Sequence, residues 1–274
     1  MKLKSLIWTL GMKPKAKHYG TQLLRFRLPE DGEIEFEKWQ HPKDYFSPFT
    51  QERVDVLRKY IHQGDTVIDI GAHSGDFSIQ LALAAGKEGC VLAVEPNPYV
   101  FDTLVKNAAL NRDKTNIVPL QAAAGSFSGT LTFHYSDPGF CNGGELAGIS
   151  KWRHGHPFPL EVPSVQVVPW MKKNIPDRIS KVTFIKTDTE GFDLTVLQSL
   201  EEIIDQNHPT IYAEMYRHLD LERRRQLWRF LDERAYKMFL NDDVYGCTEA
   251  IPLLESNLMS VSHYDVLAIH RPPR

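Results

Sequence analysis

Carboxylates and glycines gather at three places in the sequence, each directly after a short apolar run. The first place is residues 67–75, Val-Ile-Asp-Ile-Gly-Ala-His-Ser-Gly, in which Asp69 precedes Gly71 and Gly75. Gly71 allows a sharp turn of the backbone, and Gly75 allows a helix to begin close to a ligand. The G-x-G-x-x-G fingerprint of dinucleotide-binding proteins needs a second glycine where His73 stands, so this loop argues against a nicotinamide site. The alternative to a ligand loop is a glycine turn with a capping acid.

A second acid, Glu95, ends the next apolar run, residues 90–94, and Pro-Asn-Pro follows it at residues 96–98. A carboxylate in this place can accept hydrogen bonds from both hydroxyls of a ribose. Asp69 and Glu95 lie one strand-helix-strand unit apart, and each therefore strengthens the assignment of the other. A solvated loop acid is the alternative for Glu95.

A third group follows the apolar run at residues 182–185 and contains Lys186, Asp188 and Glu190. In an open α/β sheet the carboxyl edge of the strands is where ligands bind. Acids there can orient or deprotonate a hydroxyl, stabilise a nearby sulfonium cation, or hold a divalent metal, and the residues do not choose among these roles. Asp188 is the first candidate, although it can also cap a helix, and a structural ion pair is the alternative for Lys186.

Two residues near the next strand extend this group. Glu214 ends that strand, so Asp188, Glu190 and Glu214 form an alternative metal site, although a metal is not our prediction. His218 follows closely and is a second candidate for a base, with a solvated loop histidine as its alternative.

The elements that must position these groups alternate between strand and helix. Apolar patterning predicts helices at residues 51–61, 77–85, 99–111, 192–204 and 221–233, and strands at residues 66–70, 90–94, 117–123, 131–135, 182–185, 210–213, 236–240 and 265–270. This order is typical of a parallel sheet with crossover helices. Residues 23–28 and 34–39 flank an Asp-Gly turn and predict a hairpin. Residues 136–163 lack periodicity, which indicates a lid or binding loop.

Composition excludes several classes of protein. The 274 residues are 42% apolar and 24% charged, as in ordinary globular proteins and unlike fibrous or disordered chains. The net charge of −3 gives no basic excess for nucleic acid, so we predict no nucleic-acid partner. Three cysteines at irregular spacings fit neither a disulfide framework nor a zinc site and favour a reducing, cytoplasmic location.

The N-terminus differs from the rest of the chain in charge. The first 29 residues carry seven Lys and Arg and no acid, around a short apolar run that lacks the features of an export signal. Contact of this basic segment with an anionic membrane surface is one reading, but an ordinary frayed or packed N-terminus explains the same residues and is our expectation. The sequence does not indicate an oligomeric state.

Several motifs together resemble the FkbM family of S-adenosylmethionine (SAM)-dependent methyltransferases. They are the loop at residues 67–75, Val-Glu-Pro-Asn-Pro at 94–98, Asn107 and Asn111, Ala-Ala-Ala-Gly at 122–125, and Ile-Lys-Thr-Asp-Thr-Glu-Gly at 185–191. The resemblance implies an α/β, Rossmann-like class I methyltransferase fold with a mostly parallel sheet and an antiparallel last strand. Residues 51–274 would form that domain, with a loop insertion at about 136–163, and residues 1–50 a basic segment with an accessory hairpin and helix extension.

The resemblance also implies roles for residues around the cofactor, which would be SAM. Asp69, Gly71, Ala72 and Gly75 would surround its methionine end, Glu95 would bind its ribose, and Gln121 or Ala122 would border its adenine. His73 and Asn97 are further cofactor-binding candidates. At His73 the family commonly has asparagine, and this histidine can contact the cofactor, act as a base or cap the helix, of which we favour a polar contact or cap.

The acceptor is the least constrained part of the prediction. The family implies O-methylation of a hydroxyl on a sugar, glycan or natural product, with Asp188, Glu190, Lys186 and His218 as catalytic candidates. Asn142, Lys151, Trp152, Arg153, His154 and His156 in the predicted loop would suit a polar acceptor, with a surface loop as the alternative. A nucleotide-linked oxidoreductase and a non-catalytic SAM-binding protein are the alternative functions.

Overall fold

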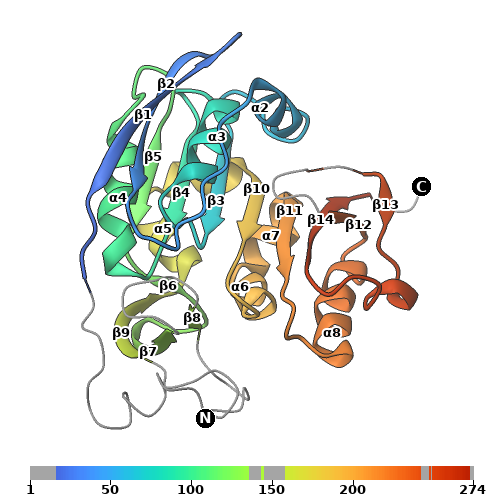
Figure 1. The fold of residues 1–274 in the computed structure, drawn as a ribbon. Helices are drawn as coiled ribbons and strands as arrows, with labels where there is room; N and C mark the ends of the chain where they lie inside the picture. Colours follow the sequence, from blue (N-terminus) through green and yellow to red (C-terminus); the bar gives the residue numbers. More distant parts are fainter. Residues whose placement is uncertain (1–16, 136–142, 145–157, 242–246, 248, 272–274) are drawn as a thin grey trace, which may run out of the picture.

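The computed structural model describes residues 17–135, 143–144, 158–241, 247 and 249–271. Its centre is an eight-stranded sheet with the strand order β13-β12-β14-β11-β10-β3-β4-β5 (Figure 1). The strands are β3 (Thr66–Ile70), β4 (Cys90–Val94), β5 (Ile117–Leu120), β10 (Val182–Thr187), β11 (Thr210–Met215), β12 (Tyr236–Asn241), β13 (Ile251–Pro252) and β14 (Tyr264–His270).

The direction of the strands confirms the expected Rossmann-like class I methyltransferase fold. Strands β3, β4, β5, β10 and β11 are parallel, and β14 is antiparallel to both of its neighbours. From β3 the chain continues outward to β4 and β5 and then returns to β10 on the other side of β3. A reversal of this kind opens a crevice at the carboxyl ends of the two central strands.

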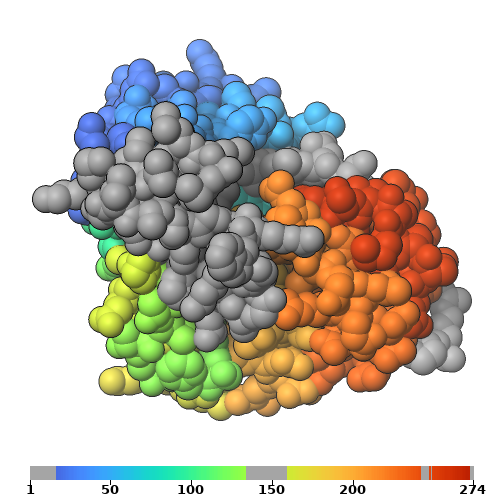
Figure 2. All heavy atoms as spheres, turned by 60° about the horizontal axis from the view of Figure 1, so that its bottom comes forward, coloured from blue at the N-terminus to red at the C-terminus, as the bar shows by residue number. Residues whose placement is uncertain are grey.

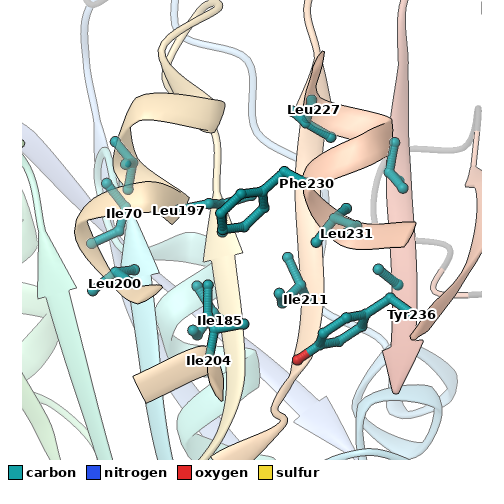
Figure 3. Packing of buried hydrophobic residues seen from close by; sticks show 14 of the residues in the cluster. Ile70, Ile185, Leu197, Leu200, Ile204, Ile211, Leu227, Phe230, Leu231 and Tyr236 are labelled. Carbon is teal, nitrogen blue, oxygen red and sulfur yellow. The ribbon is translucent and has the colours of Figure 1, made fainter. Parts of the chain in front are cut away.

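Helices cover both faces of the sheet, because successive side chains of its buried strands point to opposite faces. Helices α2 (Gln51–Leu57), α3 (Asp76–Ala85) and α4 (Pro98–Ala109) cover the face of Val67 and Phe184. Helices α5 (Val167–Asn174), α6 (Asp193–Ser199), α7 (Glu201–Asn207) and α8 (Leu221–Asp232) cover the face of Ile185 and Ile211. In Figure 3, Phe230 of α8 points toward Leu197 of α6.

The predicted N-terminal hairpin consists of β1 (Thr21–Leu28) and β2 (Gly32–Trp39) and packs into the core of the α3 face. Asn107 of α4 and Asn111, two residues beyond its end, bind the backbone of β2. The Asn107 amide donates to Glu37 O at 3.0 Å and accepts from Glu37 N at 2.7 Å, and Asn111 does the same with Glu35 at 2.8 and 2.9 Å. Asn107 also donates to Ser74 O at 2.8 Å, so one amide connects the hairpin to the glycine loop.

A second, four-stranded sheet lies beyond the carboxyl edge of the large one (Figure 1). It contains β6 (Ala123–Ala124), β7 (Gly129–Tyr135), β8 (Gly143–Gly144) and β9 (Phe158–Val165). Residues 158–163 therefore belong to a strand and not to the predicted loop. The sequence did not indicate this strand because prolines, here Pro159 and Pro163, are unusual within a strand. The acceptor-loop candidates from Asn142 to His156 lie outside the described residues.

Three further differences from the predicted elements are two divided elements and one additional helix. The strand expected at 117–123 is two strands, β5 and β6, and the helix expected at 192–204 is two helices that meet at Leu200. Helix α5 was not predicted, because Pro169 and two valines in its first turns read poorly as a helix. Among the described helices, none combines the length and the apolar character that crossing a membrane requires.

Candidate functional site

Asp69 lies at the base of the site, on the face of β3 that α3 covers. Its side chain is fully buried, and Ser78 of α3 donates a hydrogen bond to Oδ2 at 2.5 Å. The register of β3 and β10 places Lys186 directly opposite Asp69, with Lys186 Nζ 3.4 Å from Asp69 Oδ1. Burial raises the pKa of Asp69, while Lys186 and Ser78 oppose that rise. Asp69 thus anchors the loop above it from a buried ion pair.

The glycine loop approaches β10 so closely that a side chain at Gly71 cannot fit. Gly71 has φ +78°, and a Cβ there would lie 2.1 Å from the carbonyl oxygen of Asp188. Backbone hydrogen bonds join Asp188 N to Ile70 O at 3.0 Å and Gly71 N to Val94 O at 2.9 Å. Lys186 Nζ also donates to Gly71 O at 3.1 Å. The loop is therefore fixed between the ends of three strands.

Glu95 is buried, and both of its carboxylate oxygens accept backbone hydrogen bonds. His73 N donates to Oε2 at 2.9 Å and Asn97 N to Oε1 at 2.8 Å. Burial raises the pKa of Glu95 to about 7, although the two backbone donors lower it. Glu95 thereby connects the glycine loop to the turn that begins α4.

Two predicted cofactor residues, His73 and Asn97, lie on either side of Glu95 and donate their backbone N–H groups to it. Asn97 is buried, and its side chain caps α4 by accepting from Tyr99 N at 3.0 Å. His73 has φ +52°, a left-handed conformation that asparagine and histidine adopt more readily than bulkier residues. Burial lowers the pKa of the His73 imidazole, which favours its neutral form.

Two cavities meet at the glycine loop. One, here called the apolar cleft, has a volume of about 840 Å³ including space open to solvent, and Gly71, Glu95, Ala122, Phe127, Phe133 and Asp188 line it. The other, the glycine-loop pocket, is lined by Tyr45, Gly71, His73, Lys186, Asp188 and Asp265. Gly71 and Asp188 line both, so these two residues mark the junction. In Figure 2 the hairpin is at the top, the small sheet at the lower left and the C-terminal part of the chain at the right.

The predicted cofactor residues relate to these cavities in different ways. Ala72 and His73 line the glycine-loop pocket, and Glu95 and Ala122 line the apolar cleft. Gln121 does not line either cavity. Gly75 begins α3, where a Cβ would lie 2.7 Å from Leu104 Cδ1, so it serves the packing of the loop against α4.

The acidic edge, which we define as Asp188, Glu190, Asp193, Glu214 and Asp265, lies beside this junction. Asp188 is the exposed member, with half of its side chain accessible (52%), and its Oδ2 is 3.5 Å from Lys186 Nζ. Glu190 has φ +55° and donates its backbone N–H to Glu214 Oε2 at 2.8 Å. Glu214 is buried directly opposite Asp265 in the antiparallel pair of β11 and β14.

Burial, and after it the neighbouring carboxylates, raise the pKa values of the buried acids at this edge. Burial first and then Asp188 raise the pKa of Glu214 far above its ordinary range and that of Asp265 to about 7. Burial also raises the pKa of Asp193 to about 6, and that of Glu190 rises as well. Within the described part of the chain no three His, Cys, Asp or Glu residues form a group that could hold a metal.

The other catalytic candidates lie at different depths. Lys186 is buried and makes its contacts with the glycine loop and with Asp69 and Asp188. His218 is exposed and lies in a separate outer pocket, which Glu190 and Tyr216 also line, with its ring 5.2 Å from that of Tyr216. Asp188 therefore lies at the junction of the two cavities and Lys186 in the glycine-loop pocket, while His218 lines neither.

Some site residues gave no usable signal in the sequence. Ser78 binds Asp69 from within a helix, and Tyr212 OH donates to Asp265 Oδ2 at 2.9 Å. Tyr45 lines the glycine-loop pocket from a segment without periodicity. Asp265 opens the predicted last strand, and a carboxylate at a strand end was the signal that could have identified it.

Comparison with known proteins identifies the family. The chain matches the model of the methyltransferase FkbM domain over residues 69–238. It is similar to methyltransferase sdnD of Sordaria araneosa, with 25% identity over 58% of this chain and 68% of that protein. Among solved structures it is similar to methyltransferase FkbM of Methylobacillus flagellatus KT, with 17% identity and a TM-score of 0.47 over 77% of this chain and 44% of that one. It is also similar to a SAM-dependent O-methyltransferase of Thermotoga maritima, with 11% identity and a TM-score of 0.45 over 93% and 79% of the two chains. Because the family model covers more than half of the chain, including the glycine loop and most of the acidic edge, the chain belongs to the FkbM methyltransferase family.

Proposed function

We propose that this methyltransferase uses SAM to methylate a hydroxyl on a sugar, glycan or natural product. One observation carries the proposal: the exposed carboxylate of Asp188 stands beside Gly71, where the glycine-loop pocket and the apolar cleft meet. A group that can receive the proton of a hydroxyl thus lies next to the loop that would hold the methyl donor.

The residues of the two cavities fit the parts of SAM. The glycine-loop pocket contains Lys186 and several carboxylates, and charges of both signs suit a zwitterionic amino-acid end. Each carboxylate oxygen of Glu95 accepts one backbone hydrogen bond and can accept another from a ribose hydroxyl. Ala122, Phe127 and Phe133 form an apolar wall suited to a flat base.

SAM, when bound, supplies an electrophilic methyl group on a sulfonium. The chain's own residues then align the acceptor and hold its proton. Asp188 would orient the hydroxyl and receive that proton, and Lys186, 3.5 Å away, would hold the carboxylate in place. Glu190, held by Glu214 in a left-handed conformation, would border the acceptor.

Our proposals for the setting follow from composition and charge. The described cysteines, Cys90 and Cys247, are free and buried, which is consistent with a reducing cytoplasm. A small-molecule or glycan acceptor suits an edge rich in carboxylates, whereas nucleic acid would be repelled by it. A membrane contact through the basic N-terminus is not part of the proposal.

A ligand panel followed by a transfer assay tests this function. SAM and S-adenosylhomocysteine should raise the melting temperature, while NAD and NADP should not, because only a bound ligand stabilises the fold by mass action. Isotope-labelled methyl groups should then appear on a hydroxyl compound identified by mass spectrometry of co-purified ligands. Stabilisation by NAD would favour an oxidoreductase, and SAM binding without transfer to any hydroxyl would favour a non-catalytic protein.

A further inference from the structure

The connector, defined as residues 40–50 between β2 and α2, brings an unassigned side chain to the site. Tyr45 of the connector is 77% exposed and lines the glycine-loop pocket together with Gly71, His73 and Asp188. The family match begins only at residue 69, so Tyr45 lies outside it. An exposed tyrosine at the wall of a polar pocket offers both a ring and a hydroxyl to a ligand.

Aromatic contacts fix the connector on both sides of Tyr45. Before it, the His41 ring stacks on Trp39 at 4.7 Å, and His41 O accepts from Asp44 N at 3.0 Å. After it, the Phe46 ring stacks on Phe36 at 4.8 Å. Ring pairs of this kind add to the stability gained by burial. Tyr45 is therefore held at the pocket by anchored neighbours.

The residue before Tyr45 is a buried carboxyl that faces the same loop. The Asp44 side chain is 3% exposed, and its Oδ1 lies 3.9 Å from His73 Nδ1. No donor among the described residues hydrogen-bonds this oxygen, and an unsatisfied buried acceptor costs free energy until a donor reaches it. Burial and the nearby Asp76 raise the pKa of Asp44 to about 7. The connector thus presents an unmatched acceptor as well as a tyrosine beside the glycine loop.

We propose that the connector completes the amino-acid end of the cofactor pocket, with Tyr45 contacting the methionine portion of SAM and Asp44 positioning His73 and its loop. The inference rests on the proposed use of SAM and adds a specific part of the ligand to it. The ammonium and carboxylate of that portion match a hydroxyl and charges of both signs. The adenine and ribose would instead lie along Ala122 and Glu95, away from the connector.

Calorimetric titration with two ligands tests this division. S-adenosylhomocysteine carries the amino-acid end, whereas methylthioadenosine has the same adenine and ribose without it. We expect Tyr45→Ala to weaken S-adenosylhomocysteine at least fivefold and methylthioadenosine less than twofold. Tyr45→Phe separates the hydroxyl from the ring, and Asp44→Asn should shift the same ratio in the same direction. Leu23→Ala, an exposed apolar residue of the hairpin, is the matched control and should change neither affinity.

The outcomes separate the two proposals. Equal weakening of both ligands by Tyr45→Ala, or no weakening of either, overturns the role of the connector while leaving SAM binding intact. Failure of the unaltered protein to bind S-adenosylhomocysteine overturns the proposed function itself. Glu95→Gln should weaken both ligands, which shows that the assay detects a loss at the ribose end.

Discussion

The cofactor side and the acidic edge use carboxylates in opposite ways. On the cofactor side two buried carboxylates have partners that are not acids: Asp69 has Ser78 and Lys186, and Glu95 has two backbone N–H groups. At the acidic edge several carboxyls crowd together, and Glu214 lies directly opposite Asp265. Burial and then Asp188 raise the pKa of both, so these carboxyls tend to hold their protons instead of repelling each other as ions.

This difference separates binding from chemistry. A carboxylate held by such partners is fixed before a ligand arrives, which suits recognition of an invariant cofactor. A carboxyl whose pKa is raised toward neutrality, such as Asp265, suits proton transfer, although burial raises the pKa of Glu95 as far. Glu190 adds backbone strain at the edge, because a non-glycine residue at φ +55° persists only where its surroundings impose it.

The largest effect on activity is expected when Asp188 can no longer accept a proton. We expect Asp188→Asn to reduce turnover by about 10²- to 10⁴-fold, the range for a general base, with SAM affinity within about threefold. The free energy of unfolding should change little, since Asp188 disfavours ionisation of Glu214 and Asp265 but also pairs with Lys186. Single-turnover kinetics and calorimetry measure the two quantities. Asp113→Asn, an exposed acid after α4, is the control, and loss of SAM affinity in Asp188→Asn would place Asp188 on the cofactor side.

The next largest effect is expected at Gly71, where the glycine loop packs closely against the backbone of Asp188. Gly71→Ala places a Cβ 2.1 Å from the Asp188 carbonyl oxygen, in a backbone conformation that alanine rarely adopts. We expect a loss of about 2 to 4 kcal/mol in the free energy of unfolding, from strain and overpacking, together with loss of SAM binding. Urea denaturation measures the first. Gly20→Ala, where a Cβ meets nothing within 4 Å, should change neither, and a normal Gly71→Ala protein would show that the loop is loose.

A smaller effect is expected at Glu95. Glu95→Gln replaces a charged acceptor by an amide that cannot accept from both His73 N and Asn97 N. Hydrogen bonds to charged groups contribute about 1.5 to 3 kcal/mol, so we expect SAM affinity to fall about 10- to 100-fold. Turnover at saturating SAM should change little. Glu88→Gln, an exposed acid, is the control, and a loss of turnover without a loss of affinity would contradict the assignment.

The cofactor side was the part of the site that the sequence could predict. Asp69 lies near the end of a buried strand, and Gly71 and Glu95 each follow one directly, so local pattern and turn chemistry locate them without knowledge of the sheet. Asp188 was found by the same reasoning. The strands and most helices were predicted for this reason too, whereas the prolines of β9 concealed a strand.

The partnerships of these residues could not be predicted, because they depend on register and topology. The Lys186–Asp69 pair requires β10 to lie beside β3 in one register, and the Glu214–Asp265 pair requires β14 to return antiparallel to β11. A shift of one residue would turn each side chain to the other face of the sheet. Tyr45 depends on tertiary contacts of the connector, which no periodicity reveals.

The pH dependence of stability tests the raised pKa values of buried carboxyls on both sides of the site. Asp44, Glu95 and Asp265 have folded-state pKa values of about 7, above their ordinary values of 3.8 to 4.5. The folded protein therefore holds protons that the unfolded chain releases, and this stability is lost as pH rises through 7. Between pH 6.5 and 8 we expect the apoprotein to lose about 1 to 2 kcal/mol of unfolding free energy. Urea denaturation at both values measures it, and Asp265→Asn should reduce the slope. A flat profile would contradict the raised pKa values of these three carboxyls.

The smallest effect distinguishes support from contact on the cofactor side. Asn97 was predicted to bind the cofactor, and its side chain is occupied in capping α4. We expect Asn97→Ala to cost about 1 kcal/mol of stability, as other lost caps do, while Asn97→Ser, which can still cap, should recover most of it. If Asn97 acts through the cap, SAM affinity should follow stability across the two variants. A tenfold loss of affinity in Asn97→Ser, with stability recovered, would instead make the Asn97 amide a direct ligand of the cofactor.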